Sequence, residues 1–266
     1  MVSVMLLLDG RIVCHVFVIN AGVRQGGVLS PLLFSLYLDN LIDKLEACGY
    51  GCKVHGVYVG CILYADDIIL LAHTSYAMQK MLDVCSEESI SLDLKFNVNK
   101  SVALRVGPRW RSLCAPLTLG STALRFVEST KYLGVYLKCG VKYSCSYGHL
   151  KLRFYSCFNA LFSRSKASNS ELVTIELLKT VCIPVLTYAL EVTDPNRTVT
   201  SMLNNLINRA ICKIFNCYDS DTVNDAKHFL DVYDIRTLYQ ERRLAFLHKT
   251  SLVDNNVLRT VLVCCN

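Results

Sequence analysis

The sequence predicts a layered fold of strands and helices, of the α/β or α+β class, whose second half is helical. Two observations support this. Runs rich in β-branched residues at 2–19, 54–64 and 68–72 alternate with helical segments up to about residue 140. Beyond that point, apolar residues recur mainly at helical spacing. A chain that is 52% hydrophobic and 19% charged also buries a core, which excludes intrinsic disorder.

The elements of the first half follow from local signals. Asp9-Gly10, flanked by Val, Ile and Leu, predicts a hairpin of two strands. A helix comes next, with Ser30 as its expected N-cap, Pro31 in the first turn and Gly49 after its end. A second helix should begin at Thr74 or Ser75. The expected faces of these helices are Leu33, Tyr37, Leu41, Lys44 and Leu45, and then Met78, Met81, Leu82 and Cys85.

After the second helix, residues 92–106 are expected to be extended, and 117–137 to form short strands about Gly120-Ser121. The helical half should contain helices near 148–165, 170–190 and 225–250, and Pro184 should interrupt the second of these. Its clearest helix has one apolar face, made of Val199, Leu203, Leu206, Ile207, Ala210, Ile211 and Ile214.

Composition narrows the class of protein. Mean hydropathy is +0.34, but the longest apolar runs, such as Ile68 to Ala72, fall short of the roughly 18 residues of a membrane span, so we expect a soluble protein with no membrane partner and no signal peptide. The 14 cysteines are too sparse for a disulfide scaffold and indicate an intracellular, reducing compartment. Cys48, Cys52 and His55 lack a fourth ligand for zinc.

Charge is distributed unevenly along the chain. The net charge is +6, but the segment from Lys95 to Lys166 contains thirteen Lys and Arg residues against one acid, Glu128, which gives a local net charge of +12. Aromatic residues are interleaved with these basic groups, as in surfaces that bind single-stranded nucleic acid. A solvated basic face with the aromatics in the core explains the same pattern equally well.

Two adjacent carboxylates, Asp66 and Asp67, stand between two β-rich runs. Like charges at a tight turn repel, and a metal ion would relieve that repulsion. Mg²⁺ prefers carboxylate and phosphate oxygens, and two such ions can hold the attacking and leaving oxygens of a phosphoryl transfer. The alternative is an exposed hairpin turn, where Asp is common for its own reasons.

Several motifs, taken in order along the chain, resemble those of reverse transcriptases. Their residues are most similar to those of the non-LTR, LINE-like retrotransposon branch. The resemblance is sharp at four places, of which the first two are the loop Ala21 to Pro31 and the sequence Tyr64-Ala65-Asp66-Asp67. Phe96 to Ser101 resembles the lysine-bearing motif and Lys131 to Val135 the primer-grip region, while Ile183 to Tyr188 is a looser match to the thumb.

The resemblance implies a role for each matching residue. Asp66 and Asp67 correspond to ligands of two catalytic Mg²⁺ ions, and Lys100 to a general acid for the pyrophosphate leaving group. Lys100 could equally be a surface or phosphate-contacting lysine, and the primer-grip region a packed edge strand. The implied nucleotide and template contacts are Arg24, Gln25, Gly26, Gly27, Tyr64 and Ala65, and the implied primer-grip residues are Tyr132, Leu133 and Gly134.

The resemblance also implies an α+β organisation. Residues 1–140 would form a partial polymerase palm, an antiparallel sheet with helices on one face, and 141–266 a helical, thumb-like and C-terminal region. The family palm has a further metal-binding aspartate upstream of the Gly-rich loop. Asp9, in a hairpin turn, does not replace it, so we expect an N-terminally truncated domain that is inactive alone.

Two functions remain open at this point. The first is a nucleotidyltransferase that extends a DNA primer on an RNA template with deoxynucleoside triphosphates. The second is a non-catalytic nucleic-acid-binding remnant of such a polymerase. The sequence identifies no protein partner for either.

Overall fold

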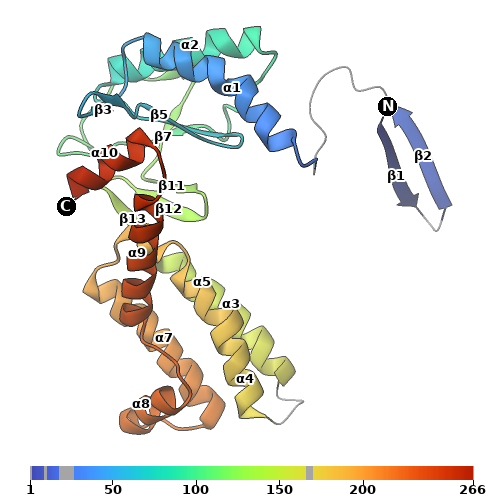
Figure 1. Ribbon diagram of the computed structural model, residues 1–266, viewed down its shortest axis with the longest axis vertical. Helices are drawn as coiled ribbons and strands as arrows, with labels where there is room; N and C mark the ends of the chain where they lie inside the picture. The colour runs from blue at the N-terminus through green and yellow to red at the C-terminus, as the bar shows by residue number, and fades with distance from the viewer. Residues whose placement is uncertain (1, 9–10, 18–26, 166–169, 266) are drawn as a thin grey trace. The chain divides into compact units, whose positions relative to one another are not determined.

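The computed structural model describes residues 2–8, 11–17, 27–165 and 170–265 (Figure 1). Contacts between residues divide the chain into two compact units. The first unit contains 1–96 and 117–123, and the second contains 97–116 and 124–266. The chain mixes helices and strands, as the α+β prediction requires.

The strands of the first unit form separate antiparallel hairpins. β1 (Val2–Leu8) pairs with β2 (Arg11–Phe17) with Leu8 opposite Arg11, which agrees with the predicted hairpin, although Asp9 and Gly10 lie outside the described residues. The other pairs are β3 (Lys53–Val54) with β4 (Val57–Tyr58), β5 (Cys61–Tyr64) with β6 (Asp67–Leu70), and β8 (Thr118–Leu119) with β9 (Thr122–Ala123).

Two helices of the first unit contact each other. α1 (Ser30–Ala47) buries Leu38, Leu41 and Leu45, and α2 (Ser75–Ser91) buries Met81, Leu82 and Cys85. Thr74 caps α2 as predicted, because its hydroxyl accepts a hydrogen bond from the Ala77 N–H at 3.1 Å. The N-cap of α1 is Leu29, so the prediction of Ser30 is wrong by one residue. Leu33 and Tyr37 are exposed, and the buried face starts one turn later than predicted.

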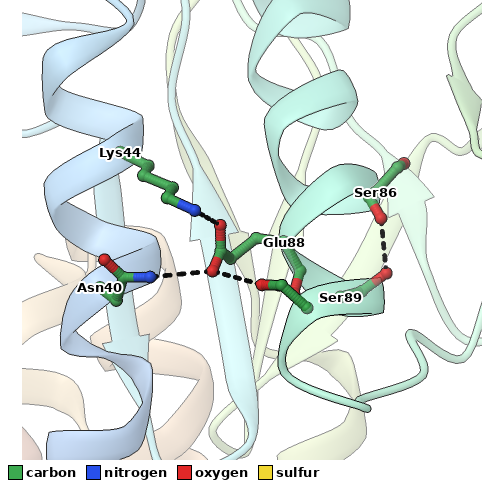
Figure 2. A network of polar contacts seen from close by, with 6 residues as sticks. Asn40, Lys44, Ser86, Glu88 and Ser89 are labelled. Atoms are coloured by element: carbon green, nitrogen blue, oxygen red, sulfur yellow. Dashed lines mark hydrogen bonds and ion pairs between the residues drawn. The ribbon is translucent and has the colours of Figure 1, made fainter.

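A buried carboxylate joins α1 to α2. The Glu88 side chain is 3% exposed and forms an ion pair with Lys44. It also accepts hydrogen bonds from Asn40 Nδ2 at 2.9 Å and from the Ser91 hydroxyl at 2.6 Å. Figure 2 shows Asn40 and Lys44 of α1 directed at this carboxylate of α2. A buried charge with this many donors is tolerated, and it fixes how the two helices meet.

We expect the stability supplied by Glu88 to depend on pH. Hydrogen bonds from Lys44 and then Ser91 lower the pKa of Glu88 below its ordinary value of 4.5, although burial acts in the opposite direction. A carboxyl whose pKa is lower in the folded state adds stability above its unfolded pKa, and that stability is lost as pH falls through the folded value. The thermal midpoint of Glu88→Gln should therefore lie below wild type at pH 7, with a gap that narrows below about pH 4.5.

The exposed neighbour Glu87 provides the matched control, since Glu87→Gln should leave the midpoint unchanged across the range. A gap between Glu88→Gln and wild type that is as large at pH 3 as at pH 7 would contradict the expectation.

The strands of the second unit are short. β7 (Val102–Ala103) pairs in parallel with β10 (Arg125–Phe126), and β11 (Ser129–Tyr132), β12 (Val135–Lys138) and β13 (Ser144–Ser146) form an antiparallel ladder. Within each unit, the described strands pair in twos and threes, and no larger antiparallel sheet is formed there. Within 92–106, where an extended segment was expected, β7 is the named strand and turns at 92–93 and 98–100 interrupt the segment.

Every named element after Ser146 is helical, as the sequence predicts. The region predicted as one helix at 225–250 is two, separated by a turn at 230–234. The helices are α3 (Gly148–Ser165), α4 (Glu171–Leu177), the π-helical turn η2 (Leu178–Cys182), α5 (Ile183–Thr187), α6 (Leu190–Thr193), α7 (Arg197–Phe215), α8 (Ser220–Phe229), α9 (Ile235–Ser251) and α10 (Asn256–Cys265).

These helices surround the core of the second unit. α7 follows the predicted face, with Leu203, Leu206, Ile207, Ala210 and Ile211 buried, and the Asn196 side chain caps its first turn. Aromatic and aliphatic side chains of α3 and of the α4 to α6 stretch pack against α7. The cluster also contains Leu150, Phe154, Phe158, Ile175, Leu178, Cys182, Ile183, Leu186, Leu190, Val223, Val232 and Ile235.

Pro184 interrupts the helical stretch as predicted. Proline has no N–H and its ring crowds the carbonyl four residues earlier, so the preceding turn widens into η2, where the Ile183 N–H bonds to the Leu178 oxygen. Glu171–Thr193 is long enough, with a hydropathy of 1.6, to pass for a membrane span. In this structure the segment contributes six residues to the core listed above. An apolar composition is typical of a core helix as well as of a membrane span.

Ala189, between α5 and α6, has φ +57° and ψ +17°, in the left-handed region. An L-residue with a Cβ is strained there by roughly 1–2 kcal/mol, whereas glycine is not. We expect Ala189→Gly to raise the free energy of unfolding by about 0.5–1 kcal/mol, because part of the relief is lost to the greater freedom of glycine in the unfolded chain. Urea unfolding measures the change.

The matched control is Ala160→Gly, at an exposed position in the interior of α3, where the same replacement should lower the free energy of unfolding by about 1 kcal/mol. If both variants were destabilised equally, the strain assigned to Ala189 would be wrong.

Candidate functional site

Asp66 and Asp67 lie at the tip of the β5–β6 hairpin, as the sequence predicts. Tyr64 is opposite Asp67, so the turn itself consists of Ala65 and Asp66. Of these two turn residues, Ala65 has a positive φ, +51°, which is the φ pattern of a type II′ turn. Glycine is the usual residue at that position, and the strain at Ala65 is of the kind that functional turns retain.

The carboxylates of Asp66 and Asp67 are accessible to solvent. Both side chains are exposed, and within the described residues neither accepts a hydrogen bond nor forms an ion pair. Their oxygens are therefore free to bind a divalent cation, and the donor set suits Mg²⁺. The tip would supply at most two protein ligands, and an octahedral ion would complete its shell with water, substrate phosphates or another carboxylate. The described residues contain no group of three His, Cys, Asp or Glu positioned around one ion.

The other residues expected to contact nucleotide or template are only partly described. Tyr64 and Ala65 are exposed beside the aspartates. Gly27 precedes α1, where its carbonyl accepts the Ser30 N–H at 3.2 Å. Arg24, Gln25 and Gly26 lie outside the described residues.

Lys100 lies in a tight turn, and its side chain is exposed. Its backbone N–H donates to the Asn97 carbonyl at 3.0 Å and to Asn97 Oδ1 at 3.2 Å. Lys100 belongs to the second unit and Asp66 to the first, and its role as a general acid stays a prediction.

The residues matching the primer grip form the β11–β12 turn. Tyr132 pairs with Val135, and the two residues between them, Leu133 and Gly134, both have positive φ, +44° and +85°. Two positive values define a type I′ turn, whose twist matches that of the flanking strands. Leu133 and Gly134 thus form a hairpin tip, with Leu133 exposed, whereas Tyr132 is half-buried at the end of β11, an edge strand of the ladder, so primer contact and a packed edge strand both stay open for it.

The basic side chains of the Lys95 to Lys166 segment are directed to solvent. All that the structure describes are exposed except Arg105, which is half-buried and donates to the Arg109 carbonyl at 2.7 Å and to the Ser112 carbonyl. None forms an ion pair within the described part of the chain. The positive charge is therefore available to an anionic partner.

The aromatic side chains of the same segment are partly buried and partly exposed. Phe154 and Phe158 are buried in the core, with ring centroids 6.0 Å apart. Phe126 and Tyr143 are exposed, and the Arg111 guanidinium lies 4.4 Å from the Trp110 ring. Several aromatics that suggested base stacking thus serve the core.

Comparison with known proteins identifies the family. The model of the family described as "Reverse transcriptase (RNA-dependent DNA polymerase)" matches residues 2–137, just over half of the chain. The chain belongs to the reverse transcriptase family. The match includes the aspartate hairpin and the β11–β12 turn.

Similar proteins of known family support this assignment. The Pol polyprotein from the type-2 retrotransposable element R2DM of Drosophila melanogaster is 32% identical over 127 residues, 45% of this chain and 12% of the relative. The RNA-directed DNA polymerase from mobile element jockey of Drosophila funebris is 28% identical over 187 residues, 65% of this chain and 19% of the relative. The chain is a reverse transcriptase domain of the non-LTR retrotransposon kind that spans a small part of these relatives' length.

Nothing in the sequence indicated the contact that Tyr188 makes. Its hydroxyl donates to the Leu133 carbonyl at 2.8 Å, so the segment Ile183 to Tyr188 contacts the β11–β12 turn. Pro184 signals a change of direction in this segment, but no periodicity or spacing predicts a contact between residues 55 positions apart.

Proposed function

We propose that this reverse transcriptase domain takes part in RNA-templated DNA synthesis by two-metal nucleotidyl transfer, within a retrotransposon polymerase. The observation that supports the proposal best is the exposed, unpaired carboxylate pair Asp66 and Asp67 at a hairpin tip of a chain in this family. Reverse transcriptase domains use divalent metal ions generally.

In this proposal Asp66 and Asp67 hold Mg²⁺, which when bound would supply charge neutralisation between the attacking oxygen and the leaving phosphates. Tyr64, Ala65 and the loop Arg24 to Gly27 contact the incoming deoxynucleoside triphosphate and the RNA template. Lys100 donates a proton to the pyrophosphate, and the Tyr132 to Gly134 turn contacts the DNA primer. Residues 1–140 correspond to part of the palm, and 141–266 to a thumb-like and C-terminal region.

The exposed basic segment is proposed to bind the backbone of the template–primer hybrid, because its charge is not neutralised by neighbouring acids. The test is extension of a labelled DNA primer annealed to RNA, with Mg²⁺ and the four deoxynucleoside triphosphates. The protein should carry this chain fused to the aspartate-bearing palm strand and fingers of a relative. Hybrid binding without extension in that fusion would favour the non-catalytic alternative.

A further inference from the structure

The tip of the β11–β12 hairpin needs an external support. Leu133 takes the first position of a type I′ turn with φ +44°, where Asn, Asp or Gly is usual. A side chain with a Cβ is strained there, and such a conformation persists only when surrounding groups determine it.

Tyr188 supplies that support from the corner between α5 and α6. Its hydroxyl donates to the Leu133 carbonyl at 2.8 Å. Its ring covers Gly134 closely, because a Cβ built on Gly134 would lie 2.9 Å from the ring carbon Cε1. Tyr188 therefore holds both residues of the turn, one by a hydrogen bond and the other by contact.

The corner that carries Tyr188 is itself fixed by α9. The Arg242 guanidinium donates to the Thr187 hydroxyl at 3.2 Å and to both carboxylate oxygens of Glu191, at 3.3 and 3.4 Å. Arg243 donates to the backbone carbonyl of Glu191 at 3.1 Å. These bonds bracket Tyr188 on both sides along the chain.

Two tyrosines complete the attachment at the end of α6. The Tyr239 hydroxyl, from α9, donates to Asp194 Oδ1 at 2.6 Å. The Tyr147 hydroxyl donates to the Thr193 carbonyl at 2.8 Å. All of these groups belong to the second unit, so the whole chain of contacts from α9 to the β11–β12 turn lies within one compact body.

We propose that Tyr188 is a positioning residue, which holds the Leu133–Gly134 turn in the shape that contacts the primer strand of a hybrid. The part of this proposal that concerns contact with the primer strand rests on the proposed function. The link from Tyr188 to the turn rests on the contacts alone.

Tyr188→Phe tests the hydrogen bond while keeping the ring, and Tyr188→Ala removes both contacts. The matched control is Tyr218→Phe, since Tyr218 is 82% exposed and makes no hydrogen bond within the described residues. Two readouts are taken on the 266-residue chain. One is amide hydrogen exchange of the peptide that contains 129–138. The other is the affinity for a labelled RNA–DNA hybrid and for a single strand of equal length.

Loss of one hydrogen bond corresponds to about a fivefold change in an equilibrium. In Tyr188→Phe we expect exchange at the turn to become about fivefold faster and hybrid affinity to fall by a similar factor of about five, with single-strand affinity unchanged. Tyr188→Ala should show larger changes in both, and Tyr218→Phe neither.

Unchanged exchange in Tyr188→Phe and Tyr188→Ala would overturn the inference. Faster exchange with unchanged hybrid affinity, in a chain whose wild type binds the hybrid, would also overturn it, because the turn would then have no role in primer contact. A wild type that does not bind the hybrid would refute the proposed function and the primer role together, while the exchange data would still decide whether Tyr188 holds the turn.

Discussion

Primer extension is expected to disappear when Asp66 is replaced by asparagine. The replacement keeps the size of the side chain but removes one of the two negative charges at the β5–β6 tip. We expect the rate of Mg²⁺-dependent extension, in the fusion with the upstream palm strand and fingers, to fall on the order of 10³-fold, as when a preorganised charge-stabilising group is lost. Hybrid affinity should stay within about twofold, because the basic segment is untouched.

The 266-residue chain alone is expected to give no extension product. One hairpin tip provides carboxylates from one direction, whereas two ions about 3.5–4 Å apart need ligands from several. Asp43→Asn is the matched control, since Asp43 is an exposed, unpaired carboxylate on α1 among the described residues. Mg²⁺-dependent product from the chain alone, lost in Asp66→Asn and retained in Asp43→Asn, would show that a further carboxylate within this chain completes the site.

Hybrid binding is expected to weaken steeply with salt. Each phosphate neutralised by Lys or Arg releases a counterion, and affinity falls with salt concentration in proportion. If four or five of the exposed basic side chains contact phosphates, raising salt from 50 to 200 mM should increase Kd on the order of 10²-fold. Fluorescence anisotropy with a labelled hybrid measures this.

A matched pair of triple variants locates the effect. Replacing the exposed α3 residues Lys151, Arg153 and Arg164 with Gln should weaken binding and make its salt dependence shallower. The control replaces three exposed basic residues outside the segment, Arg197, Arg236 and Lys249, and should change little. Equal losses in the two variants would mean that binding follows net charge and not the segment.

Local signals in the sequence were sufficient for several elements. The α7 face, the Thr74 cap and the aspartate hairpin were all predicted, because each depends on residues within a few positions of one another. The position of the Asp66–Asp67 pair at a turn followed from the β-rich runs on each side. The family followed from short motifs in order, and the match to residues 2–137 confirmed it.

The tertiary structure decided what depends on distant residues. Helical periodicity identifies the apolar face of a helix but not the element that packs against it. Leu33 and Tyr37 were expected on the buried face of α1 but are exposed, whereas Leu38 is buried. The sequence left open whether Phe154 and Phe158 stack on bases or pack in the core, and the tertiary structure places both in the core. Local patterns also did not reveal the contact of Tyr188 with the Leu133–Gly134 turn, because packing and hydrogen bonds across 55 positions leave no repeat in the sequence.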